Sequence, residues 1–131
     1  MILLALSGRV TGEEWAQMFS DIDDVLAAGR PFAVVCDATQ IKLPDVPELR
    51  RCAEFMRLRR VRLEPLQLGI ACVTRSAMIR GALKGVARMS SCAVPVMALD
   101  CPREALAWAG ARIEGKRARD TRLGSSATRM P

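Results

Sequence analysis

The sequence predicts an α/β protein with a four-stranded, mainly parallel sheet covered by four helices. Four short apolar runs alternate along the chain with segments whose apolar residues recur at helical spacing. The runs are apolar at successive positions, which is typical of strands buried on both faces of a parallel sheet. A length of 131 residues suits one domain. Right-handed crossovers restrict the topology, and the simplest doubly wound strand order is 2-1-3-4.

The first part of the chain predicts a strand, a helix and a second strand. Residues 2–6 form a short apolar run. Thr11 stands three residues before Glu14, which predicts a capping box at a helix start, and Gly29 supplies the stop. Residues 32–36 form the second apolar run. The helix between them carries one apolar stripe, made of Trp15, Met18, Phe19, Ile22, Val25 and Leu26.

A second helix is predicted to begin after Asp45. The Asp45 carboxylate is a good N-cap, and Pro47 suits the first turn of a helix. We expect this helix to end before Pro65. Its apolar positions face a core, while its other faces carry several arginines.

The second half predicts two further strand–helix pairs. Residues 68–73 form the third strand, and Ser76 is placed to cap the third helix. Residues 94–99 form the fourth strand, where Pro95 favours a sheet edge. The last helix begins near Pro102.

The helical pattern stops near residue 114. Residues 114–131 carry five bases, two acids and few large apolar side chains. Such a segment buries too little apolar surface to order itself. We therefore expect an α/β domain over residues 1–113 and a flexible basic C-terminal tail over residues 114–131.

Composition argues against several classes of enzyme. The chain has no histidine, the most common general base and metal ligand. Its five cysteines include no CxxC pair, so we interpret them as small buried side chains rather than zinc ligands. We expect no catalytic residues, metal or cofactor. No apolar run approaches the roughly 20 residues of a membrane helix. A cytoplasmic location without membrane contact is the expectation.

Charge is unevenly distributed. Residues 1–45 carry seven acids and three bases, whereas residues 46–131 carry seven acids and 17 bases. This asymmetry fits an electrostatic partner, either an acidic protein or a nucleic acid. It fits equally well a GC-rich genome that favours arginine codons.

Four segments together resemble a known family. They are GRVTGEEW at 8–15, FAVVCD at 32–37, ACVT at 71–74 followed by Ser76 and Arg80-Gly81, and DCPREALAW at 100–108. Their order and spacing resemble the STAS/anti-sigma-factor-antagonist superfamily, in particular its SpoIIAA-like branch of small bacterial proteins. The resemblance implies a STAS-like fold and a non-enzymatic, regulatory protein-interaction module.

One regulatory feature of that family has no counterpart here. Some members are switched by phosphorylation of a serine in an Asp-Ser-Ser-Gly-like turn at the start of the second helix. The matching positions in this chain are Asp45, Val46 and Pro47, so Val46 replaces the hydroxyl. We interpret Asp45 as a helix cap.

Two surfaces are candidates for docking a protein partner. One is the arginine-rich side of the second helix, with Arg50, Arg51, Arg57 and Arg60. The other is the backbone edge of strand 32–36, which the 2-1-3-4 order leaves uncovered. An edge without charge or proline is a template for another strand, so we expect a homodimer or an added partner strand there, with Phe32 and Val34 at the contact.

Two alternatives remain open. Thr74, Arg75 and Ser76 lie where the third strand meets its helix, and could hold a small anion or nucleotide. Asp37, at the end of the second strand, is a possible site acid.

The arginine-rich helix and tail could instead contact nucleic acid. Aromatic residues are only 4% of the chain, so such binding would be non-specific and salt-sensitive.

Overall fold

The computed structural model describes residues 2–129, with side chains described as far as residue 121. Its centre is a sheet of four parallel strands: β1 (Ile2–Gly8), β2 (Phe32–Ile41), β3 (Gln67–Val73) and β4 (Val96–Leu99). Five helices surround the sheet: α1 (Gly12–Ala28), α2 (Val46–Leu58), α3 (Arg60–Leu66), α4 (Ala77–Ser90) and α5 (Pro102–Arg129). The predicted α/β class with a parallel sheet is confirmed.

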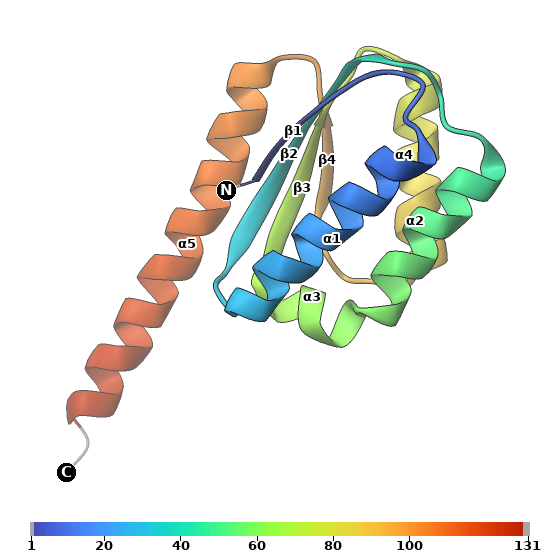
Figure 1. Cartoon of the computed structure of the whole chain (residues 1–131). Helices are drawn as coiled ribbons and strands as arrows, with labels where there is room; N and C mark the ends of the chain where they lie inside the picture. Colours follow the sequence, from blue (N-terminus) through green and yellow to red (C-terminus); the bar gives the residue numbers. More distant parts are fainter. Residues whose placement is uncertain (1, 130–131) are drawn as a thin grey trace.

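The helices cover the two faces of the sheet unequally. Helices α1 to α4 lie on one face, and α5 crosses the other alone (Figure 1). The strands follow one another across the sheet in the order β1-β2-β3-β4. Because right-handed crossovers that always step in one direction keep their helices on one face, the topology explains this grouping.

The predicted strand order 2-1-3-4 is therefore wrong. β2 buries four successive residues, Phe32 to Val35, whereas β1 leaves Leu3, Ala5 and Ser7 exposed. A strand buried on both faces belongs inside the sheet, and a half-exposed strand tolerates an edge. The other edge is β4, as Pro95 indicated, although Pro95 itself lies just before the strand.

The docking edge expected at residues 32–36 is also wrong. β2 pairs with β1 on one side and with β3 on the other, so this stretch has no free backbone edge. Phe32 and Val34 are 3% and 4% exposed and belong to the core. Because both side chains are buried and both edges of β2 are paired, the predicted homodimer contact through this strand cannot form.

Two helix predictions need correction. The second predicted helix is divided at Arg59 into α2 and α3, and Pro65 lies inside α3 rather than beyond it. The last helix continues through residues 114–129, where we expected an irregular tail. Charged pairs one turn apart support its extension: Arg117 with Glu114, and Lys116 with Asp120. Residues 130–131 lie outside the described residues.

The predicted helix starts are confirmed by their caps. The Thr11 hydroxyl accepts a hydrogen bond from the Glu14 backbone N–H at 3.2 Å, and the Glu14 carboxylate accepts one from the Thr11 backbone N–H at 3.1 Å. Asp45 and Glu48 form the same capping box on α2. The Ser76 hydroxyl caps α4.

Two hydrophobic cores lie on opposite sides of the sheet. On the α5 side the contacts are short, because small residues meet: Ala33 and Ala71 of the sheet face Ala105 of the helix. A Cβ atom on Gly69 would lie only 2.4 Å from a ring carbon of Trp108. On the other side, α1 and α3 pack on larger side chains, and this side contains a cavity.

Candidate functional site

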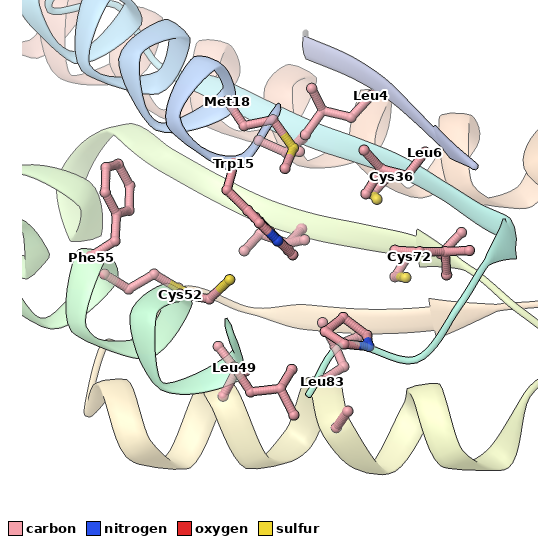
Figure 2. Close-up of a pocket in the computed structure, with 18 of the residues that line it drawn as sticks. Leu4, Leu6, Trp15, Met18, Cys36, Leu49, Cys52, Phe55, Cys72 and Leu83 are labelled. Carbon is pink, nitrogen blue, oxygen red and sulfur yellow. The ribbon is translucent and has the colours of Figure 1, made fainter. Parts of the chain in front are cut away.

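An apolar cavity of about 210 Å³ lies between the sheet and helices α1, α2 and α4. Figure 2 shows side chains from all three helices and from the strands pointing into it. Apart from the amide of Gln67, its wall is made of aliphatic, aromatic and sulfur-containing side chains, among them Leu6, Trp15, Met18, Cys52, Cys72 and Leu83. None of the described side chains that line it is charged. Such a space suits an apolar group and offers a charge no partner.

The outer wall of the cavity is formed by contacts between α1 and α2. The Trp15 indole N–H donates a 2.8 Å hydrogen bond to the Glu48 carboxylate, which is buried. One turn further along α1, Phe19 stacks on Phe55 of α2 with ring centroids 4.3 Å apart. These bulky side chains join the two helices to each other above the sheet.

The same row of contacts continues one more turn. Asp23 of α1 accepts two hydrogen bonds from the Arg59 guanidinium, at 2.6 and 3.0 Å. The guanidinium also lies over the Phe55 ring, 3.9 Å from its centroid. The Arg59 hydrogen bonds hold the pKa of Asp23 below its usual value. Trp15, Phe19 and Asp23 are spaced four residues apart, so one face of α1 makes all three contacts.

The sheet side of the cavity carries both short and long side chains. Cys36 and Ala38 of β2 and Cys72 of β3 are short, whereas Leu6 of β1 and Ile70 of β3 are longer. Aromatic side chains of α1 and α2 line the opposite side, and the cavity lies between the two.

Basic residues gather at one end of this cavity. Trp15 lines both the cavity and a second hollow at the starts of α1 and α2, where Arg9 and Arg51 lie. Arg9 is exposed, with its guanidinium 3.7 Å from the Asp45 carboxylate and 3.9 Å from that of Glu48. A ligand projecting from the cavity at this end would meet the guanidinium groups of Arg9 and Arg51 together with the carboxylates of Asp45 and Glu48.

The predicted arginine surface is exposed but lies outside the cavity. Arg50, Arg51, Arg57 and Arg60 are all exposed. Arg57 forms a surface ion pair with Glu54, which raises the pKa of Arg57 and lowers that of Glu54 through their hydrogen bond. Within the described side chains, no ion pair is formed by Arg50, Arg51 or Arg60.

The predicted anion turn uses its donors internally. The Thr74 hydroxyl accepts from Ser76 N–H at 3.1 Å, and the Ser76 hydroxyl accepts from Ile79 N–H at 3.2 Å. Thr74 is 1% exposed, while Arg75 points to solvent. The geometry matches a helix cap. Anion binding by this turn stays a prediction.

The sequence predicted that Asp37 ends its strand. This is wrong, because β2 continues to Ile41. Its carboxylate accepts hydrogen bonds from the Thr39 hydroxyl at 2.7 Å and from the Thr39 N–H at 3.1 Å. These bonds lower the pKa of Asp37, first through the side chain and then through the backbone. A role as a site acid stays a prediction.

Sequence reasoning did not find the cavity. Its residues have the spacing of packed core positions in the sequence. The hydrogen bond between Trp15 and Glu48 joins residues 33 positions apart, so no local pattern indicates it. One signal was available: Cys36 and Cys72 occupy equivalent places in two predicted strands. Among the described residues, no three His, Cys, Asp or Glu side chains gather as a metal site would require.

Comparison with solved structures gives the fold. The chain is similar to the crystal structure of an uncharacterized protein of the DUF3478 family with a SpoIIAA-like fold, from Shewanella loihica PV-4. The TM-score is 0.59, the identity is 15%, and the match covers 82% of each chain. The protein has a SpoIIAA/STAS-like fold, as the sequence resemblance indicated. No protein-family model and no curated protein matches the sequence.

Within residues 2–129, each helix is either too short or too polar to cross a bilayer.

Proposed function

We propose that this protein is a binding module that takes up an apolar small molecule in the cavity and acts without transforming it. The observation that carries the proposal is the cavity of about 210 Å³ with its uncharged, apolar wall. An engineered apolar cavity of about 150 Å³ stays dry and binds benzene, so a space of this size accommodates a hydrocarbon group.

Energetics support an occupant. Empty apolar cavities destabilise proteins by about 24 cal/mol per Å³. A ligand that fills the space recovers part of this cost through contacts with the wall.

The basic residues at the cavity end suggest the chemical class of the ligand. Arg9 and Arg51 lie beside Trp15, outside the apolar wall. An amphipathic molecule with a hydrocarbon tail and an anionic head group would place its tail in the cavity and its head near these guanidinium groups.

Tryptophan fluorescence tests the proposal directly. Trp15 lines the cavity, whereas Trp108 lies across the sheet against Gly69, so a Trp108→Phe background reports on Trp15 alone. Titration with decanoic acid and with decanol should change the Trp15 emission saturably. An absence of saturation with both compounds would contradict the proposal.

Two pairs of variants sharpen this experiment. Ala82 of α4 lines the cavity, so Ala82→Leu should fill it and weaken both ligands, whereas exposed Ala77→Leu in the same helix should not. Arg9→Met and Arg51→Met should weaken decanoic acid and spare decanol. Equal binding by the Ala82 and Ala77 variants would place the ligand elsewhere.

A second candidate function is docking of an acidic protein, as expected of a regulatory STAS-like module. The supporting observation is the exposed arginine surface of α2 and α3. Arg50→Glu with Arg60→Glu should abolish retention of acidic proteins on the immobilised chain, and Arg103→Glu with Arg117→Glu on α5 should leave it unchanged. The same columns, loaded with DNA or RNA at low salt, test nucleic-acid binding, for which we expect only salt-sensitive retention.

A further inference from the structure

Two cysteines of the cavity wall are neighbours across adjacent strands. Cys36 of β2 and Cys72 of β3 are paired in the register of the sheet. Both side chains line the cavity (Figure 2). Adjacent strands lie about 4.8 Å apart, and the Cα atoms of a disulfide are about 4.4–6.8 Å apart. The backbone therefore places these thiols where a disulfide could close between them. Both are free thiols in the structure.

The two thiols have different environments. The hydrogen bond from Cys36 lowers the pKa of the Cys72 thiol, against the opposing effects of burial and of Asp37. The same interaction, together with burial, raises the pKa of Cys36. The two thiols therefore titrate as a pair, in which contact between the sulfurs favours one thiolate beside one protonated thiol. A thiolate beside a protonated thiol is the arrangement that thiol oxidation uses.

The third cysteine of the cavity provides a contrast. Cys52 lies on α2, on the helical side of the cavity. Burial raises the pKa of Cys52 to about 11. It shares the apolar surroundings of the pair but has no cysteine beside it in a strand register.

We propose that Cys36 and Cys72 form a redox-active dithiol in the cavity wall, and that an organic hydroperoxide oxidises this dithiol to a disulfide. The apolar wall favours a hydroperoxide that carries a hydrocarbon group over hydrogen peroxide. Oxidation goes beyond ligand binding and requires no resident ligand. A failure of the fatty-acid titration and a failure of dithiol oxidation are therefore separate results.

The chemistry is a two-electron exchange in two steps. The Cys72 thiolate attacks one oxygen of the hydroperoxide, the S–O bond forms, the O–O bond breaks, and the alkoxide leaves as an alcohol with a proton from water. Cys72 is now a sulfenic acid. The Cys36 sulfur then attacks the Cys72 sulfur, the S–S bond forms and the S–O bond breaks. Hydroxide leaves as water with the proton of Cys36. Two thiols are oxidised, and one hydroperoxide is reduced to an alcohol and water.

Peptide mapping of the wild-type chain tests this proposal. Trypsin separates the three cavity cysteines onto peptides 10–42, 52–57 and 63–75, since the bond from Arg30 to Pro31 resists cleavage. The reduced chain is treated with equimolar cumene hydroperoxide, alkylated with N-ethylmaleimide and digested. We expect peptides 10–42 and 63–75 to appear joined, and to separate after dithiothreitol treatment. Alkylation of both cysteines, or a link to peptide 52–57 instead, would overturn the proposal.

Three variants assign the roles within the pair. Cys36→Ser should stop at a sulfenic acid on Cys72 that dimedone traps. Cys72→Ser should consume cumene hydroperoxide at least about tenfold more slowly than the wild type, since the thiolate is the nucleophile. Cys52→Ser is the matched control and should form the disulfide at the wild-type rate. Loss of the disulfide in the Cys52 variant would contradict the assignment, and hydrogen peroxide reacting faster than cumene hydroperoxide would contradict the role of the apolar wall.

Discussion

The indole N–H of Trp15 donates a 2.8 Å hydrogen bond to the carboxylate of Glu48, which is 6% exposed. Glu48 also completes the capping box of α2 with Asp45, so one carboxylate both starts α2 and fastens it to α1. Because Trp15 lines the cavity as well, this bond joins the helix layer at one end of the candidate site.

Trp15→Phe should lower the free energy of unfolding by about 2 kcal/mol, because it leaves a buried carboxylate without its indole donor. Glu48→Gln should cost less, since its amide oxygen still accepts from the indole and glutamine also serves in a capping box. Urea unfolding of the two variants measures both losses. A Trp15→Phe variant as stable as the wild type would show that the hydrogen bond contributes nothing to stability.

The ion pair between Asp23 and Arg59 predicts a specific pH dependence. The Arg59 hydrogen bonds lower the pKa of Asp23 in the folded protein. Between its folded and unfolded pKa values the unfolded chain binds more protons, so stability there rises with pH. The contribution of Asp23 is complete above the unfolded pKa of about 3.9 and is lost as the pH falls through the folded pKa.

Asp23→Asn should therefore destabilise the protein at pH 7. The difference in free energy of unfolding between variant and wild type should become smaller as the pH falls below 4. The side chain of Asp23 is 39% exposed, so we expect a modest loss of about 1 kcal/mol or less at neutral pH. Unfolding curves at several pH values measure it, with exposed Asp24→Asn as the control. A difference that stays constant down to pH 2 would contradict the ion-pair explanation.

Two glycines should respond in opposite ways to alanine. A Cβ on Gly69 would lie 2.4 and 2.7 Å from ring carbons of Trp108, so Gly69→Ala must displace the ring and should cost about 1–3 kcal/mol. A Cβ on Gly81, inside α4, would meet nothing within 4 Å, so Gly81→Ala should stabilise the protein by up to about 1 kcal/mol. Thermal unfolding compares them. Equal effects would mean that α5 does not press against β3 at Gly69.

The helix starts could be predicted from the sequence because their causes are local. Thr11 with Glu14, and Asp45 with Glu48, each satisfy a helix start within four residues of chain. The apolar runs likewise locate four strands. Nothing beyond the neighbouring residues is needed for these features.

The strand order and the cavity could not be predicted because they depend on contacts between distant segments. Several strand orders bury the same apolar runs. The edge strand and the central strand differ only in burial: one side of β1 is exposed, whereas residues 32–35 of β2 are buried on both faces. The cavity is harder still. Trp15 and Cys72 have the pattern of packed core residues, and only the three-dimensional spacing of α1 and α2 above the sheet leaves a space between them.

The sequence predicts that the folded domain ends after residue 113. The side chains of α5 that pack on the sheet, Ala105, Trp108, Ala109 and Ile113, all lie within that domain, and Ala105 and Ala109 are fully buried. A chain ending at residue 114 should therefore keep its fold with a loss of about 1 kcal/mol or less. A chain ending at residue 107 loses the Trp108 contact with Gly69 and should not unfold cooperatively. Circular dichroism melts of both truncations test this, and cooperative melting of the shorter chain would mean that α5 is dispensable for covering the sheet.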